Sequence, residues 1–101
     1  MSDRELLELA AKAAGYEYAK HGGYIVVDGI PGNWNPLQDD GDALRLAVNL
    51  QIDVKHYGYY VVAWFEGGFI GTGKIPYGDD TYAATRRAIV RAAAEIGRSK
   101  P

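Results

Sequence analysis

The chain has 101 residues, a formal net charge of −2 and 48% hydrophobic residues, and it contains no cysteine. This composition is typical of one ordinary globular domain, which we expect to span residues 1–101. The lack of cysteine excludes a disulfide scaffold, a cysteine nucleophile and a thiolate metal site, and the small negative charge argues against a general nucleic-acid binder. No apolar run approaches the roughly 20 residues of a membrane span, and the charged start Met1–Glu5 is unlike a signal peptide.

The first third of the chain predicts a helix followed by a hairpin. Ser2 and Glu5 have the spacing of a capping box, and apolar residues recur at helical spacing up to Gly15, a plausible helix stop. Two strands are then predicted at 16–20 and 24–27 around the turn 21–23. The stretch 28–36 is rich in Gly, Pro and Asn and predicts a loop long enough to be a candidate for function.

Two further helices are predicted to begin at pairs of aspartates, because an Asp N-cap accepts the free N–H groups of the first turn. Their predicted spans run from Asp39 or Asp40 to about Leu50, and from Asp79 or Asp80 to near Gly97. The first of these has a broad apolar face that includes Leu44 and Val48, which predicts that it is well buried. In the closing helix, Tyr82 is expected to face the core.

Three more strands are predicted between these two helices, at 52–57, 59–65 and 69–74. The middle one is apolar on both faces, which favours a central place in a sheet that is covered on both sides. Hairpin connections dominate the order α-β-β-α-β-β-β-α. The sequence therefore predicts an α+β fold in which one mainly antiparallel five-stranded sheet packs with three helices.

Three stretches resemble a known group of proteins, and together they cover all three predicted helices: 3–15, 34–48 and 82–97. They are similar to small uncharacterised phage and prophage proteins of the phage ABA (α/β/α) sandwich domain family. The resemblance implies a single α/β sandwich domain and a phage origin. It brings no established catalytic or binding residues, and the strands between the helices match no pattern of the family.

A set of residues for catalysis is not recognisable in the sequence. The only serines, Ser2 and Ser99, lie near the two ends, and no nucleophile stands beside a base in a known motif. His21 and His56 do not have the spacing of a metal-ligand pair, and the acidic cluster 39–42 lacks the remaining ligands of a calcium loop, so helix capping explains it better. We therefore predict a protein that is not an enzyme and that uses no metal or cofactor.

Tyrosine is abundant, with eight residues in 101, and tyrosine suits binding surfaces because it joins a rigid ring to a polar tip. Tyr57, Tyr59 and Tyr77 fall at strand ends or in loops, where ligand contact and simple packing are both open. Trp34 is either a lid over the core or a stacking platform, whereas Tyr60, Trp64 and Tyr82 are expected in the core. Arg86, Arg87 or Arg91 would hold a phosphate while a ring stacks on its base. The predicted ligand-binding residues are Trp34, Tyr57, Tyr59, Tyr77, Arg86 and Arg87.

Two functional hypotheses follow from these residues and the resemblance. In the first, a phage-encoded homo-oligomer in the host cytoplasm counters bacterial defence by sequestering a small nucleotide-derived immune signal. In the second, an anti-CRISPR-like inhibitor presents the acidic stretch Asp28–Asp42 to a defence protein as a mimic of phosphates. Neither hypothesis involves a membrane or direct nucleic-acid binding. The lack of a catalytic set and the surplus of tyrosine place sequestration slightly first.

Overall fold

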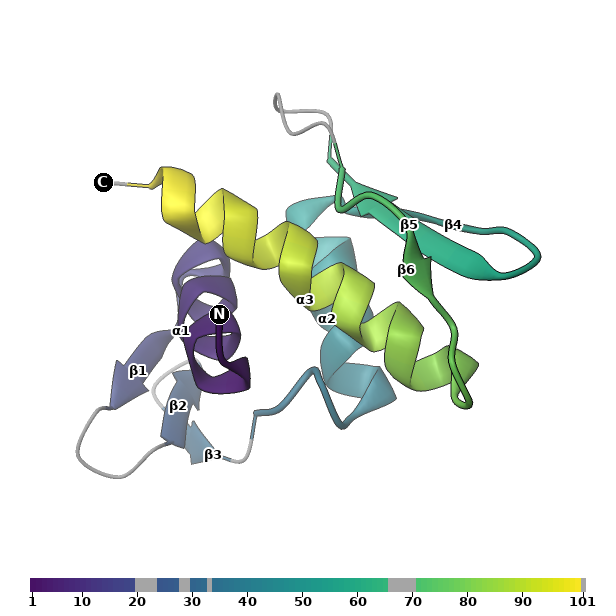
Figure 1. The fold of residues 1–101 in the computed structure, drawn as a ribbon. Helices are drawn as coiled ribbons and strands as arrows, with labels where there is room; N and C mark the ends of the chain where they lie inside the picture. The colour runs from purple at the N-terminus through teal and green to yellow at the C-terminus, as the bar shows by residue number, and fades with distance from the viewer. Residues whose placement is uncertain (20–23, 28–29, 33, 66–70, 101) are drawn as a thin grey trace.

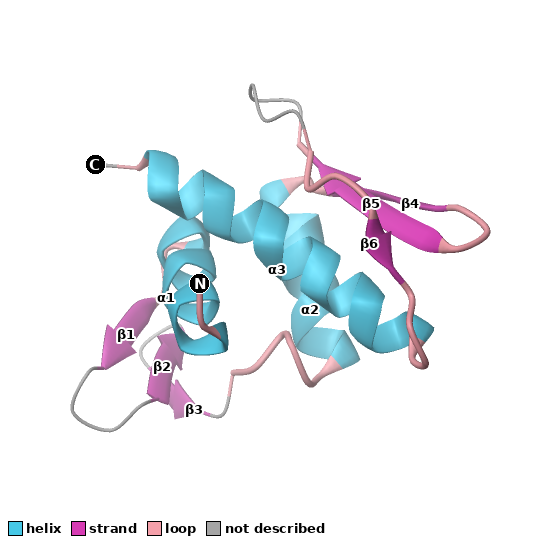
Figure 2. Cartoon of the chain, viewed as in Figure 1, coloured by secondary structure: helices cyan, strands magenta, loops and turns pink. Residues whose placement is uncertain are grey.

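The computed structural model describes residues 1–19, 24–27, 30–32, 34–65 and 71–100. These residues form three helices and six strands, with three strands between each helix and the next (Figures 1 and 2). In chain order they are α1 (Asp3–Ala14), β1 (Glu17–Ala19), β2 (Tyr24–Val27), β3 (Ile30–Gly32), α2 (Asp40–Leu50), β4 (Asp53–His56), β5 (Tyr60–Trp64), β6 (Ile75–Pro76) and α3 (Thr81–Ser99).

The strands form two separate three-stranded antiparallel sheets, so the predicted single five-stranded sheet is wrong. One sheet has the order β1-β2-β3 and lies beside α1, and the other has the order β4-β5-β6 and packs on α3. The two sheets lie on opposite sides of the helices (Figure 2). The second edge of β2 pairs with β3 rather than with a strand of the other sheet, and the helices lie between the two sheets (Figure 2). The α+β class itself holds.

Two short edge strands that contain proline were not predicted as strands. β3 includes Pro31 and β6 includes Pro76, and each pairs with only one neighbour. Proline lacks a backbone N–H and is tolerated at such an edge, so its presence gave a misleading loop signal. The strand predicted at 69–74 is also wrong where it can be compared, because residues 71–74 are not in a strand. Residues 20–23, 28–29, 33 and 66–70 lie outside the described part of the chain.

The predicted helix starts are confirmed by their caps. The Ser2 hydroxyl accepts the N–H of Glu5 at 3.2 Å at the start of α1, and Gly15 ends that helix in the left-handed conformation with φ +79°. The Asp39 carboxylate caps α2, and the Asp80 carboxylate caps α3. Each cap satisfies a backbone donor that the helix itself leaves unpaired.

Helix α3 is the element against which most of the fold packs, because it contacts α1, α2 and β5. Small side chains allow this closeness, and Ala88, Ala92 and Ala93 are fully buried. Helix α3 ends at Ser99, two residues beyond Gly97 and close to the predicted end. A Cβ atom at Gly97 would overlap the carbonyl oxygen of Leu9 in α1, so glycine is needed for the two backbones to meet. No helix in the described part of the chain is both long and apolar enough to cross a bilayer.

Three apolar side chains that were expected inside face solvent. Leu44 and Val48 of α2 are 64% and 66% exposed, and Tyr82 of α3 is 72% exposed. In α2 the buried positions are Ala43, Leu46 and Ala47, so the inner stripe is narrower than predicted. β5 is central in its sheet as predicted, but one of its faces is buried, at Val61 and Ala63, while the side chains of the other face are half-buried.

Candidate functional site

A groove of about 470 Å³ lies between α2, β4 and the first half of α3. This volume falls within the roughly 300–1,000 Å³ that is common for small-ligand sites. We call it the α2–α3 groove. Its walls are formed by Asp40, Ala43, Leu44, His56, Thr81, Tyr82, Thr85, Arg86 and Ile89.

Arg86 is a fixed cation in the wall of this groove. Its Nε donates to the carbonyl oxygen of Leu37 at 2.9 Å, and its Nη1 donates to Asp40 Oδ1 at 2.6 Å. Its side chain is only 15% exposed. A guanidinium has five N–H donors, and the described contacts use two of them. Arg86 therefore joins α3 to the start of α2 and keeps donors for a bound group.

A short chain of hydrogen bonds runs from His56 to the backbone of α3. The Thr85 hydroxyl donates its single proton to the carbonyl oxygen of Thr81 at 2.8 Å. His56 Nε2 lies 2.9 Å from the same hydroxyl oxygen, so the ring N–H must be the donor in this contact. In a neutral ring this leaves Nδ1 as an acceptor. The groove thus presents an oriented imidazole beside a hydroxyl.

The remaining wall of the groove is apolar and includes a free aromatic ring. Ile89 is buried at its base, whereas Leu44 and Tyr82 are mostly exposed. Exposed apolar side chains beside a few fixed polar groups are the usual composition of a ligand site. The Tyr82 ring is available for stacking.

Four side chains form a second surface feature at the β4–β5 hairpin, which we call the tyrosine–lysine face: Lys55, Tyr57, Tyr60 and Lys74. The rings of Tyr57 and Tyr60 are stacked, with centroids 4.7 Å apart and planes at 17°. Lys55 Nζ lies 5.2 Å from the centre of the Tyr57 ring, and Lys74 Nζ lies 5.0 Å from the centre of the Tyr60 ring. Two cations therefore flank a stacked aromatic pair.

Tyr77 connects this hairpin to the α2–α3 groove. Its hydroxyl donates to the carbonyl oxygen of Tyr57 at 2.8 Å. Its ring stacks on His56, with centroids 6.2 Å apart and planes at 24°. Tyr59, at the hairpin turn, is 88% exposed. The structure thus brings the three predicted tyrosines Tyr57, Tyr59 and Tyr77 to one end of the β4–β5–β6 sheet.

Trp34 and Arg87 lie outside both features. Trp34 is half-buried against the core and meets Tyr16 edge-on, with ring centroids 5.5 Å apart, which is the arrangement expected of a lid. Arg87 Nη2 lies 3.1 Å from Asp3 Oδ1 and ties α3 to α1. Of the six predicted ligand-binding residues, only Arg86 lines the groove.

The acidic cluster at the start of α2 is engaged by the chain itself. Asp39 caps the helix, and Asp40 pairs with Arg86. Asp42 accepts the N–H of Asn35 at 2.9 Å and Nη2 of Arg45 at 2.8 Å. The hydrogen bond to Asp42 raises the pKa of the Arg45 guanidinium above its usual value. Asp28 lies outside the described residues, and within those residues no three side chains of His, Asp or Glu gather as metal ligands.

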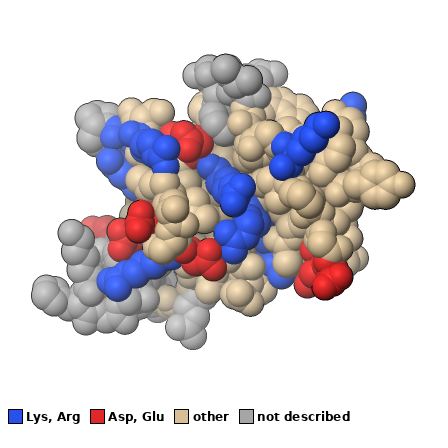
Figure 3. Space-filling model, viewed as in Figure 1, with Lys and Arg blue, Asp and Glu red and all other residues tan. Residues whose placement is uncertain are grey.

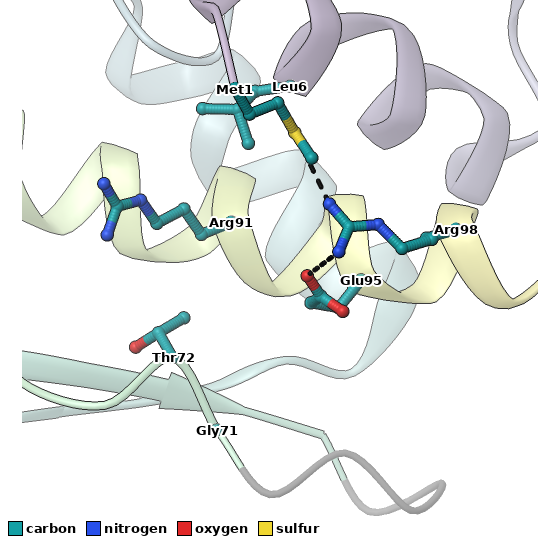
Figure 4. A pocket seen from close by; sticks show the side chains of 7 residues that line it. All are labelled: Met1, Leu6, Gly71, Thr72, Arg91, Glu95 and Arg98. Atoms are coloured by element: carbon teal, nitrogen blue, oxygen red, sulfur yellow. Dashed lines mark hydrogen bonds and ion pairs between the residues drawn. The ribbon is translucent and has the colours of Figure 1, made fainter.

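A smaller pocket of about 280 Å³ lies between α1, α3 and residues 71–72 (Figure 4). Arg98 crosses it, with Nη1 3.2 Å from Glu95 Oε1 and Nη2 3.7 Å from Met1 Sδ. Arg91 points away from this pair in the same view (Figure 4). The α2–α3 groove is the stronger candidate because it is larger, at about 470 Å³ against 280 Å³, and because it joins a fixed guanidinium to an exposed aromatic ring.

The sequence analysis missed His56, Thr85, Leu44 and Tyr82 as parts of a site. From the sequence, His56 was considered only as a metal ligand. Thr81 and Thr85 are four residues apart, which places them on one face of a helix but does not indicate a binding site. Tyr82 and Leu44 are apolar at helical spacing, which normally indicates burial. Only the relative placement of α2 and α3 reveals that these two side chains border an open groove.

In comparisons with known proteins, no family model, no curated protein and no solved structure matches the chain. The similarity to phage proteins therefore stays a prediction from the sequence.

Proposed function

We propose that the chain is a non-catalytic protein that binds a small nucleotide-derived ligand in the α2–α3 groove. The observation that carries this proposal is the pairing of a fixed guanidinium, Arg86, with the exposed ring of Tyr82 in one groove. Guanidinium groups bind phosphate through charge-assisted hydrogen bonds. Aromatic rings stack on nucleobases, so the two side chains complement the two halves of a nucleotide.

The charges of Arg86 and Asp40 determine which kind of phosphate group fits the groove best. Asp40 already offsets part of the positive charge of Arg86, because the two groups are in direct contact. A second negative charge near Asp40 would be repelled. The groove therefore favours a phosphodiester, which carries one charge, over a terminal phosphate monoester. His56 and Thr85 lie in the same wall and supply hydrogen-bonding groups for a sugar or for the edge of a base.

The similarity to phage proteins extends this proposal to a role. A phage protein that holds a cyclic nucleotide signal without converting it would lower the free concentration of that signal in the host cytoplasm. A site shared by two copies of the chain would raise the affinity for this ligand. The alternative of an acidic phosphate mimic gains less support, because Asp39, Asp40 and Asp42 already serve as caps and ion-pair partners.

Thermal unfolding of the chain with a panel of cyclic dinucleotides, larger cyclic oligonucleotides and ADP-ribose derivatives tests the proposal. A ligand at about 100 times its Kd adds about 2.7 kcal/mol to the free energy of unfolding, which raises the Tm of a domain of this size by several degrees. Recovery of the intact ligand by chromatography checks that it is bound and not converted.

Two variants locate the binding. Tyr82→Ala should lose the stabilisation by ligand while keeping the Tm of the free protein, because its side chain is 72% exposed. Tyr59→Ala removes an even more exposed ring, 88% against 72%, outside the groove and should bind as the original chain does. No shift with any ligand of the panel, or an equal shift in the Tyr82→Ala variant, would overturn the proposal.

A further inference from the structure

We propose that the outward face of the β4–β5–β6 sheet binds single-stranded nucleic acid, through the tyrosine–lysine face. This surface is separate from the α2–α3 groove, and the inference does not rest on the function proposed for that groove. It departs from the expectation drawn from the net charge of −2, which is an average over the whole chain.

The strand register separates the two faces of this sheet. His56 lies opposite Val61, and Lys55 lies opposite Val62. Val61 is fully buried beneath α3, so the side chains at alternate positions, which include those of Lys55, Tyr60 and Val62, point away from the helices. Tyr57 continues the same series, and its ring stacks on that of Tyr60. The helices cover one face of the sheet and leave this row of side chains outside.

Each ring of the stacked pair has one side against the other ring and one side against a lysine. Among the described residues, the ammonium groups of Lys55 and Lys74 lie against the outer sides, at 5.2 and 5.0 Å from the ring centres. A lysine side chain is long and flexible. A nucleobase can displace it from the ring while the ammonium moves to the phosphate beside that base. Each ring and its lysine therefore form a unit that complements one nucleotide.

The combination of aromatic rings and lysines favours single-stranded nucleic acid over other partners. Stacking needs unpaired bases, and aromatic rings combined with cations are the usual means of binding single strands without sequence preference. In Figure 3 the part of the surface over β4–β6 carries basic and uncharged side chains, and the nearest group of acidic side chains lies below it. Asp53 is the acid of β4, and it lies opposite Trp64 at the other end of the strand pair. A protein partner with an acidic patch would use the lysines but would gain little from stacked rings.

Fluorescence anisotropy with labelled oligothymidylate and oligouridylate, titrated with the full chain at several salt concentrations, tests the proposal. Binding should weaken with salt, with a slope of log K against log salt of about −0.7 for each phosphate contact. Lys55→Gln should make the slope less steep by about that amount. Lys12→Gln, which removes the same charge from α1, should leave both the slope and the affinity unchanged.

The ring contribution is measured separately. Tyr57→Ala should weaken binding by roughly tenfold or more, whereas Tyr57→Phe keeps the ring and should bind as the original chain does. Circular dichroism melting shows that each variant is folded, and the Phe variant keeps the test valid if the Ala variant is not. Equal affinity for duplex DNA or heparin, equal loss in Lys12→Gln, or no anisotropy change at low salt would each overturn the proposal. The Tyr82→Ala variant should bind single strands normally, so a failure here is distinct from a failure in the groove.

Discussion

Gly97 is a residue at which one methyl group decides whether α1 and α3 can pack. Alanine is favoured over glycine in a helix by about 1 kcal/mol, but a Cβ atom here would overlap the backbone of Leu9. Overpacking a core costs about 1–3 kcal/mol, and more where only backbone can move. We therefore expect Gly97→Ala to lower the free energy of unfolding by about 2 kcal/mol in urea denaturation.

The matched control is Gly41 in the first turn of α2. The closest atoms to a Cβ there are side-chain atoms of Arg45 and Asp39, at 3.2 Å, which need to shift by only a few tenths of an ångström, and none of these nearest atoms belongs to the backbone. Gly41→Ala should thus be neutral or stabilising by about 0.5 kcal/mol. Equal effects of the two substitutions would show that Gly97 is not a contact between helices.

Arg86 is expected to contribute to stability as well as to the groove. Arg86→Met removes the hydrogen bond to the Leu37 carbonyl and the ion pair with Asp40, and we expect a loss of about 1–3 kcal/mol in the free energy of unfolding. Arg91→Met changes the same charge at an exposed position of the same helix and should have an effect within about 0.5 kcal/mol. Urea denaturation of both variants compares them directly. A neutral Arg86→Met would contradict the structural role.

At the scale of elements, the start of α3 separates two neighbouring aspartates that the sequence treats alike. The Asp80 carboxylate accepts the N–H of Ala83 at 3.0 Å, and Asp79 lies outside the helix. Loss of an N-cap costs about 1 kcal/mol. Asp80→Ala should lower the Tm by several degrees in calorimetry, and Asp79→Ala should not. The reverse order would place the helix start one residue earlier.

The two sheets differ in how they are held. Strand β5 packs on α3, whereas the β1–β2–β3 sheet contacts the rest of the fold through β1 and α1. Elements with few tertiary contacts open at lower free energy than the core. We expect amide hydrogens in β5 to exchange more slowly than those in β2, as measured by hydrogen exchange with mass spectrometry. Equal protection in the two strands would mean that both sheets open only with the whole molecule.

For the molecule as a whole, local signals predicted the helices well and the sheets poorly. Helix starts at Ser2, Asp39 and Asp80 follow from caps that act within four residues, so the sequence contains all the information. Sheet partners depend on contacts between distant segments. Proline in β3 and in β6 favours a loop locally, although both segments are strands, and no local signal shows that the described strands form two sheets.

The candidate site shows the same division. Tyr57, Tyr59 and Tyr77 were predicted as ligand-binding residues, and the structure brings them to one end of the β4–β5–β6 sheet, where their role in binding stays a prediction. The sequence could not show that Asp3 and Asp40 would engage Arg87 and Arg86, because these carboxylates are distant in the chain. Nor could it show that Tyr82 stays outside, since its spacing is that of a core residue.

The contact between Leu9 and Gly97 also has a consequence for how a cell makes this protein. Helix α1 is synthesised before its main packing partner, α3, and all the other described elements lie between the two in the chain. The apolar face of α1 is therefore exposed to solvent while the segments between the two helices are translated. Until α3 emerges, this exposed apolar surface favours aggregation of the nascent chain.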